Sequence, residues 1–186
     1  MKKMVFLLVA MLAMTSTVLA QEITLDGSWA MLKEKGTYML WVVYNDMKIG
    51  DKSVEEFLKT QDEKFVNDWN NEVVPQSMQY ALLIPNYANK KFTVDQYNPQ
   101  YKFVLKLNTL DLGFGGGAFI PFAGAKAGGA EISGELQVFS AKDELLGTMT
   151  FKEVKGVSVM TDAQRWGMSY YELGNRLKKA VKKYKE

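Results

Sequence analysis

The chain contains no cysteine and no histidine, and these two absences remove most familiar reaction centres. Without cysteine it has no disulfide, no thiolate nucleophile and no iron–sulfur site, and without histidine it has no Ser-His-Asp triad and no ordinary zinc site. Its 186 residues carry 23 basic and 21 acidic side chains, so no basic excess marks a nucleic-acid-binding protein. We therefore expect a non-catalytic protein with no cofactor, no metal and no nucleic-acid partner.

Residues 1–20 have the pattern of an export signal. Lys2 and Lys3 are followed by a strongly apolar run over residues 4–14, and Val18-Leu19-Ala20 fits a cleavage site after Ala20. The apolar run is about half of the roughly 20 residues that a membrane span needs. An uncleaved N-terminal anchor is the alternative. Cleavage removes two basic residues and leaves 21 of each sign, so the mature chain of residues 21–186 has no net charge and is expected in the periplasm or secreted.

The first half of the mature chain predicts a strand followed by a helix. Residues 37–45 are β-rich and apolar on both faces, which is typical of a central strand covered on two sides or of one end of a layered core. Ser53 and Glu56 have capping-box spacing, and the helix that they begin should stop or kink at Pro75.

Residues 76–99 give weaker signals. Residues 78–84 are apolar and fit either a short helix or a strand, and turn-forming residues follow them. Residues 92–94 fit a short edge strand.

The second half predicts three strands in a meander. Residues 101–108 and 131–139 alternate between apolar and polar side chains, so we expect them to pair antiparallel. Opposite charges favour one register, with four expected neighbours: Lys102 with Glu135, Lys106 with Glu131, Leu105 with Ile132, and Phe103 with Gly134. Residues 145–157 supply the third strand.

The chain ends in a predicted amphipathic helix. Thr161 and Gln164 have capping-box spacing, and an apolar stripe follows at intervals of three and four residues: Trp166, Tyr170, Leu173, Leu177, Val181 and Tyr184. Gly174 interrupts the helix and suggests close approach to a strand. The whole order, strand-helix-strand-strand-strand-helix, predicts a single α+β domain: a two-layer sandwich with a mainly antiparallel sheet and helices on one face.

A glycine-rich segment, residues 113–129, connects the two paired strands and is our first candidate interaction surface. It lacks the lysine and the spacing of a phosphate-binding loop. Its apolar side chains form either an exposed tip that docks on a partner, a lipid surface or a hydrophobic ligand, or a lid folded over the core. These candidate residues are Phe114, Phe119, Ile120 and Phe122.

The C-terminal helix carries the second candidate surface. Residues 176–186 hold six basic side chains and one acidic one, whereas residues 21–175 hold 15 basic and 20 acidic ones. The basic residues are Arg176, Lys178, Lys179, Lys182, Lys183 and Lys185. They form either a solvated face that a helix C-terminus favours, or a site of attraction for anionic lipid headgroups or an acidic partner.

Other residue patterns give little sign of chemistry. The acidic pairs Glu55/Glu56, Asp62/Glu63 and Asp143/Glu144 are neighbours in sequence and do not form the opposed carboxylates of a catalytic cleft. The four tryptophans, Trp29, Trp41, Trp69 and Trp166, are compatible with a sugar-stacking platform. Because Trp41, Trp69 and Trp166 fall on predicted core faces, we expect core packing instead.

The order of these segments resembles small signal-peptide-bearing domains of unknown function from Gram-negative envelopes. The similarity lies in the strands at 38–44, 101–105 and 130–136, in the helix with Phe65 and Trp69, and in the terminal helix with Arg165 and residues 170–174. The arrangement is also similar to α/β envelope lipoproteins that assist transport machines, which have an N-terminal cysteine that this chain lacks. The resemblance implies no catalytic residue.

Together these features predict an exported, non-catalytic domain that binds a protein partner or an envelope component, with possible peripheral contact between the C-terminal helix and an anionic membrane. The alternative is a carrier that holds a small hydrophobic ligand between helices and sheet, with the glycine-rich segment as its lid. The sequence does not indicate an oligomeric state.

Overall fold

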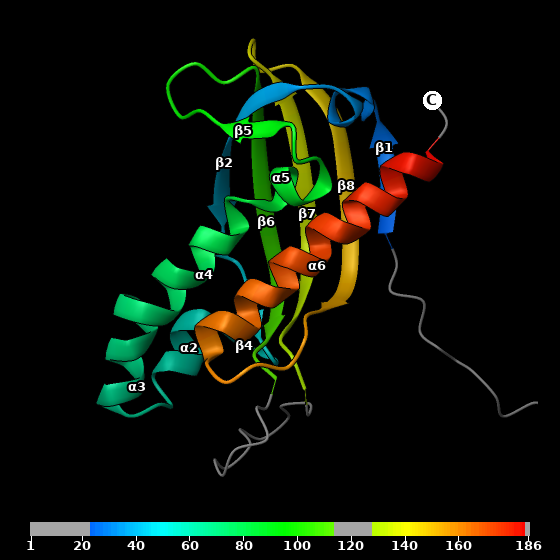
Figure 1. The fold of residues 1–186 in the computed structure, drawn as a ribbon. Coiled ribbons are helices and arrows are strands. Elements are labelled where there is room, and N and C mark those ends of the chain that lie inside the picture. The colour runs from blue at the N-terminus through cyan, green and yellow to red at the C-terminus, as the bar shows by residue number, and fades with distance from the viewer. Residues whose placement is uncertain (1–22, 114–127, 185–186) are drawn as a thin grey trace, which may run out of the picture.

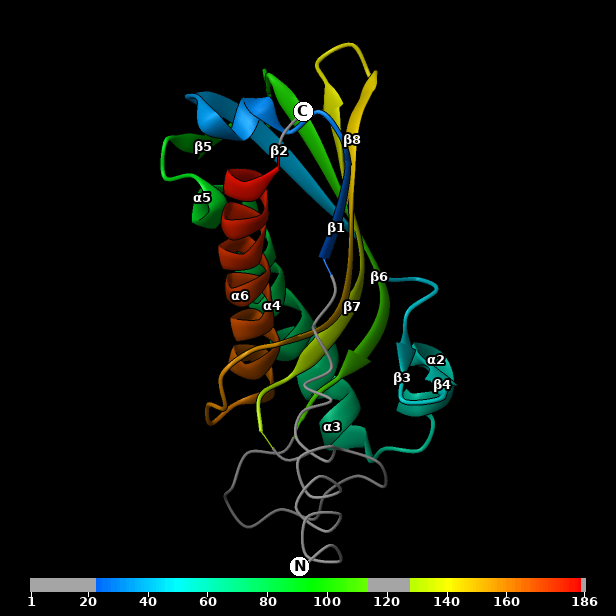
Figure 2. The same cartoon turned by 90° about the vertical axis from the view of Figure 1, so that its right-hand side faces the viewer.

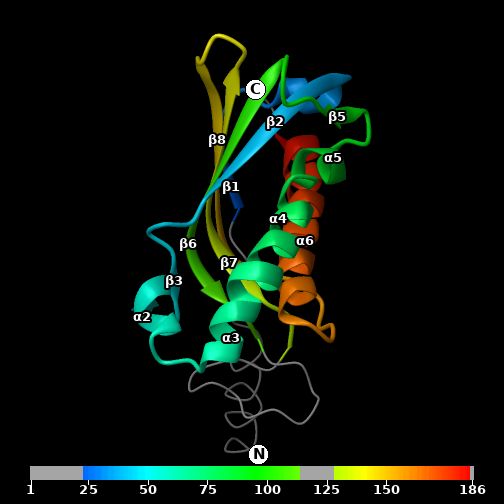
Figure 3. The same cartoon turned by 90° about the vertical axis from the view of Figure 1, so that its left-hand side faces the viewer.

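The computed structural model describes residues 23–113 and 128–184, which form an α+β fold (Figure 1). Helices α4 (Val74–Ala81), α5 (Ile84–Ala88) and α6 (Asp162–Lys183) lie on one face of a single sheet (Figures 2 and 3). The predicted export segment and the candidate residues Phe114, Phe119, Ile120 and Phe122 lie outside the described residues.

The sheet is mixed, so the prediction of a mainly antiparallel sheet with a simple strand-helix order is wrong. Its main path runs, in spatial order, through β1 (Ile23–Gly27), β8 (Leu145–Lys155), β7 (Glu131–Ser140), β6 (Tyr101–Asp111), β2 (Gly36–Val43) and β5 (Phe92–Val94). The first four strands pair antiparallel with one another, but β2 runs parallel to both β6 and β5. The helices between β2 and β5 return the chain to the end where β2 began, and a strand that starts there must run parallel to β2.

The helical crossover begins at the predicted capping box. Ser53 Oγ accepts from the Glu56 amide at 3.2 Å, and Glu56 accepts from the Ser53 amide at 2.9 Å. The remaining elements between η1 (Ala30–Lys33) and α4 are β3 (Lys48–Ile49), β4 (Lys52–Ser53), α2 (Val54–Leu58), α3 (Glu63–Asp68) and the π-helical turn η2 (Trp69–Val73). The prediction of one helix from Ser53 to Pro75 is wrong, because α2 ends at Leu58 and α3 begins anew at Glu63. Pro75 does not end the second part: it lies in the first turn of α4, where proline is well tolerated, and α4 runs on to Ala81.

Strands β6 and β7 pair antiparallel as predicted, but the predicted register is wrong by four residues. Lys102 lies opposite Phe139 and Lys106 lies opposite Glu135. Lys106 therefore lies opposite the other glutamate, and Lys102 bonds instead to Asp143 in the β7–β8 turn at 2.6 Å. A shift of four keeps every side chain on its own face, so Phe103 and Leu105 remain in the core beside Val138 and Leu136.

Three of the four tryptophans belong to the core. The prediction of core packing is confirmed for Trp69 and Trp166 and is wrong for Trp41. Trp29, Trp69 and Trp166 are buried, and the rings of Trp69 and Trp166 stack with centroids 5.5 Å apart. Trp41 is 48% exposed because β2 turns its alternate side chains, Tyr38 and Leu40, toward the helices and leaves Trp41 on the outer face of the sheet. The prediction that this strand is covered on both sides is therefore wrong.

Helix α6 packs on the sheet and on the crossover helices through its apolar stripe. Thr161 caps the helix by accepting from the Gln164 amide at 3.2 Å, and the stripe from Trp166 to Val181 is buried. Gly174 does allow a close approach, but to α5 and not to a strand: a Cβ at this position would lie 2.5 Å from the Cβ of Tyr87 and 2.9 Å from the Ile84 carbonyl oxygen.

Candidate functional site

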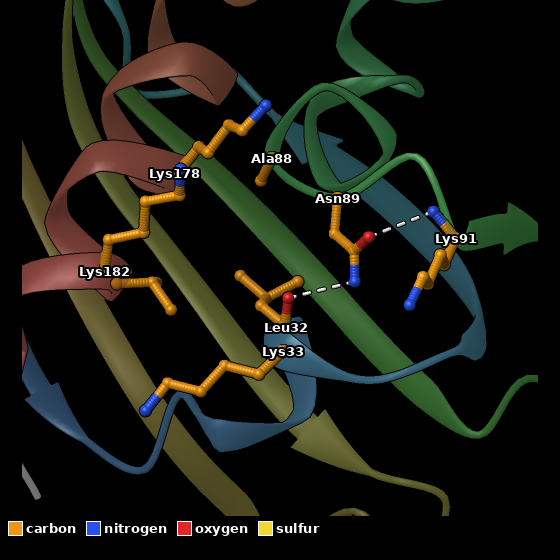
Figure 4. A pocket seen from close by; sticks show the side chains of 8 residues that line it. Leu32, Lys33, Ala88, Asn89, Lys91, Lys178 and Lys182 are labelled. Atoms are coloured by element: carbon orange, nitrogen blue, oxygen red, sulfur yellow. Dashed lines mark hydrogen bonds between the residues drawn. The ribbon is translucent and has the colours of Figure 1, made fainter.

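A hollow of about 400 Å³ lies where the last turns of α6 meet η1 and the connection between α5 and β5. Four lysines from three separate segments surround it, and an apolar floor lies between them (Figure 4). The lining consists of Lys33, Lys91, Lys178, Lys182, Leu32, Ala88, Val181 and Asn89. We call this feature the lysine-rimmed hollow.

Asn89 fixes two of the lysine-bearing segments against each other. Its side-chain amide donates to the Leu32 carbonyl at 3.0 Å and to the Glu34 carbonyl at 2.6 Å, and its oxygen accepts from the Lys91 amide at 3.0 Å (Figure 4). These bonds tie η1, which carries Lys33, to the residues that follow α5. The backbone positions of Lys33 and Lys91 around the hollow are therefore set by one partly exposed network of bonds between the Asn89 side chain and backbone groups.

Helix α6 contributes the other two lysines. Lys178 and Lys182 are one turn apart, and the buried side chain of Val181 lines the hollow with them. The helix macrodipole places about half a negative charge at this end, which stabilises cations there. Half a charge does not offset four lysines, so the hollow keeps a positive potential.

The charge around the hollow is unbalanced. Among the described residues, no acidic side chain lines it. Like charges spaced by four on a helix destabilise by about 0.2–0.5 kcal/mol, so Lys178 and Lys182 repel each other weakly. A bound anion would relieve it, and this arrangement can therefore hold an anionic group without any chemical transformation.

The structure divides the lysines predicted from the sequence into two pairs. All four side chains are exposed, but Lys178 and Lys182 line the hollow, whereas Lys179 and Lys183 do not belong to its lining. Arg176 is paired with Glu172, with 2.9 Å between Nε and Oε1. Sequence reasoning missed Lys33 and Lys91, because only the fold brings residues so distant along the chain to the end of α6.

Each acidic pair has at least one member with a structural role, and Asp62 caps α3 by accepting from the Phe65 amide at 2.7 Å. Glu55 pairs with Lys59 at 2.5 Å, Glu56 completes the capping box, and Asp143 pairs with Lys102. Within residues 23–113 and 128–184, no group of three or more acidic side chains is placed to hold a metal ion. In the same residues, every helix is too short or too polar to cross a membrane.

Comparison with known proteins adds a distant structural likeness. No protein family model matches the chain, and no curated protein is significantly similar in sequence. A PelC dodecamer from Paraburkholderia phytofirmans is similar in structure, with 7% identity over 84% of this chain and 96% of that chain and a TM-score of 0.43. A variant of PelC from the same organism gives 8% identity, the same coverage of both chains and a TM-score of 0.40. Similarity at this level does not bear on the function or assembly of this chain.

Proposed function

We propose that this protein is an exported, non-catalytic binding protein whose lysine-rimmed hollow takes an anionic group of a protein partner or an envelope component. The observation that carries the proposal is that four lysines, Lys33, Lys91, Lys178 and Lys182, surround one hollow. Among the described residues, no acidic side chain belongs to its lining. A solvated helix face accounts for Lys178 and Lys182, but it does not account for the two lysines that come from other segments.

Paired substitutions on α6 test this proposal, because the helix offers a matched control. We expect Lys178→Gln with Lys182→Gln to weaken binding to phosphatidylglycerol vesicles or to a polyglutamate peptide about 30-fold, since each cation near an anionic surface contributes about 1 kcal/mol. Lys179→Gln with Lys183→Gln removes the same charge from the same turns of the helix outside the hollow. Co-sedimentation with the vesicles and fluorescence titration with the peptide, both at low salt, measure the affinity of the two double variants.

The control pair decides between the hollow and a diffuse electrostatic surface. Under the proposal, the Lys179/Lys183 variant keeps affinity within about threefold of the wild type, because its lost charges lie outside the lining of the hollow and contribute only through the screened field of the surface. Equal losses in the two variants would assign the binding to net charge alone and contradict a role for the hollow.

Export is part of the same proposal and rests on the sequence of residues 1–20. The protein recovered from the periplasm or the medium of expressing cells should have the intact mass of a chain that begins at Gln21. A full-length mass in the membrane fraction would support the uncleaved anchor instead.

The carrier of a small hydrophobic ligand stays a prediction, since its expected lid falls within residues 114–127, outside the described residues. Native mass spectrometry of the purified protein tests it directly. A co-purifying uncharged hydrophobic molecule would favour the carrier, and a co-purifying protein would favour the binding protein proposed above.

A further inference from the structure

The side chains that line the lysine-rimmed hollow offer a ligand only two kinds of surface. One is the set of four lysine ammonium groups, and the other is aliphatic carbon from Leu32, Ala88 and Val181 together with the lysine stems. The floor residues keep only 6%, 7% and 5% of their surface exposed, so they are firmly held by the core and form a fixed base.

Both amide protons of Asn89, the neutral polar residue in the described lining, are already used, and its oxygen already accepts one bond. Its amide donates to two carbonyl groups and its oxygen accepts from the Lys91 amide. No aromatic ring belongs to the described lining either. The hollow therefore has little to offer the hydroxyl groups of a sugar or the flat edge and faces of a base, which need neutral donors, acceptors and stacking partners.

We propose that the hollow binds an amphiphilic organic anion, with a phosphate or carboxylate head held by the lysines and an aliphatic chain lying on the floor. This inference rests on the proposed function and names the ligand class for the same site. The volume of about 400 Å³ is at the small end of the ~300–1,000 Å³ usual for ligand pockets. It suits a short chain or the first part of a longer one.

A series of alkyl phosphates tests the apolar half of the site. Each methylene that leaves water for an apolar surface tightens binding by up to about fourfold. Because the floor is small, we expect butyl phosphate to bind at least tenfold tighter than methyl phosphate, with no further gain once the chain outgrows the hollow. Isothermal titration calorimetry of the mature protein measures the series, and the uncharged butyl glucoside, which lacks the charged head, should show no binding.

A floor substitution provides a second measurement. Val181→Thr replaces one methyl group of the floor by a hydroxyl, so it should reduce the gain from methyl to butyl phosphate while leaving the affinity for methyl phosphate unchanged. Loss of methyl phosphate binding in this variant would mean that the valine supports the lysine rim and not a chain, which contradicts the inference.

The series separates this inference from the proposed function. Equal affinity for methyl and butyl phosphate would contradict the inference that the ligand is an amphiphile, but it would still be consistent with a hollow that binds anions. If neither phosphate binds to folded wild-type protein, both proposals fail.

The same chemistry is available from a free small molecule and from a membrane lipid, and vesicles distinguish the two. Binding to phosphatidic acid vesicles that is lost in the Lys178/Lys182 variant and kept in the Lys179/Lys183 variant identifies a membrane lipid as the source. Binding of soluble alkyl phosphates alone identifies a free amphiphile. Equal vesicle binding by both variants, together with unchanged alkyl phosphate affinity, would contradict a site in the hollow.

Discussion

Replacing Gly174 by alanine will destabilise the protein, although alanine is the better helix former by about 1 kcal/mol. The new Cβ would overlap the Tyr87 Cβ at 2.5 Å and the Ile84 carbonyl oxygen at 2.9 Å, and both belong to the rigid framework of α5 and not to the end of a flexible side chain. Overpacking of this kind costs about 1–3 kcal/mol, which exceeds the gain in helix propensity, so we expect a net loss of about 1 kcal/mol for alanine and more for valine.

Chemical denaturation measures this loss, and the neighbouring residue supplies the control. Asn175→Ala makes a similar change in helix propensity at a half-buried position of the same helix, so it should be neutral or slightly stabilising. A Gly174→Ala variant that is more stable than the wild type would show that α5 can move away from α6, and the close packing described above would then not constrain the fold.

Replacing Arg165 by alanine is expected to lower the free energy of unfolding by about 3 kcal/mol, because it removes a buried charged donor from several acceptors at once. Arg165 is 7% exposed, and burial lowers the pKa of its guanidinium. It donates to the carbonyls of Leu112 at 3.1 Å, Val159 at 3.2 Å and Met160 at 3.0 Å, and it pairs with Asp162. These bonds join the residue after β6 to the start of α6.

The matched control for Arg165 lies on the same helix. Arg176 also pairs with an acidic residue one turn away, Glu172, but both side chains are more exposed. Arg176→Ala should therefore cost no more than about 1 kcal/mol. Hydrogen exchange gives a second readout, since Arg165→Ala should speed exchange at the β6 end near Leu110 and Leu112, whereas Arg176→Ala should not. Equal small losses in both variants would show that the Arg165 network contributes no more than a surface ion pair.

The sequence predicted the elements whose pattern is local and left the long-range pairing open. The capping box at Ser53, the alternating strands β6 and β7, and the apolar stripe of α6 all follow from side-chain spacing within one segment. The parallel pairing of β2 with β6 joins residues as far apart as Tyr38 and Tyr101, and no local spacing encodes it.

The errors have equally specific causes. Alternation cannot distinguish registers that differ by an even number of residues, and the charge on Lys102, which favoured one register, is satisfied by Asp143 outside the strand. Residues of β2 are apolar on both faces, so pattern alone could not tell that Trp41 is on the outer side. Lys33 and Lys91 were not predicted as part of the lysine-rimmed hollow, because no local pattern places them near α6. The bonds of Asn89 hold their segments together at the hollow.

The placement of the four tryptophans gives the protein two optical signals without any label. Trp69 and Trp166 are stacked inside the core, so their transition dipoles couple and contribute a circular dichroism band that disappears when the helices separate from one another. Trp41 is within reach of a dissolved quencher on the outer sheet face, while the three buried indoles are shielded. Dichroism therefore reports on the packing of α6 against the crossover helices, and quenching reports on whatever covers the opposite side of the sheet.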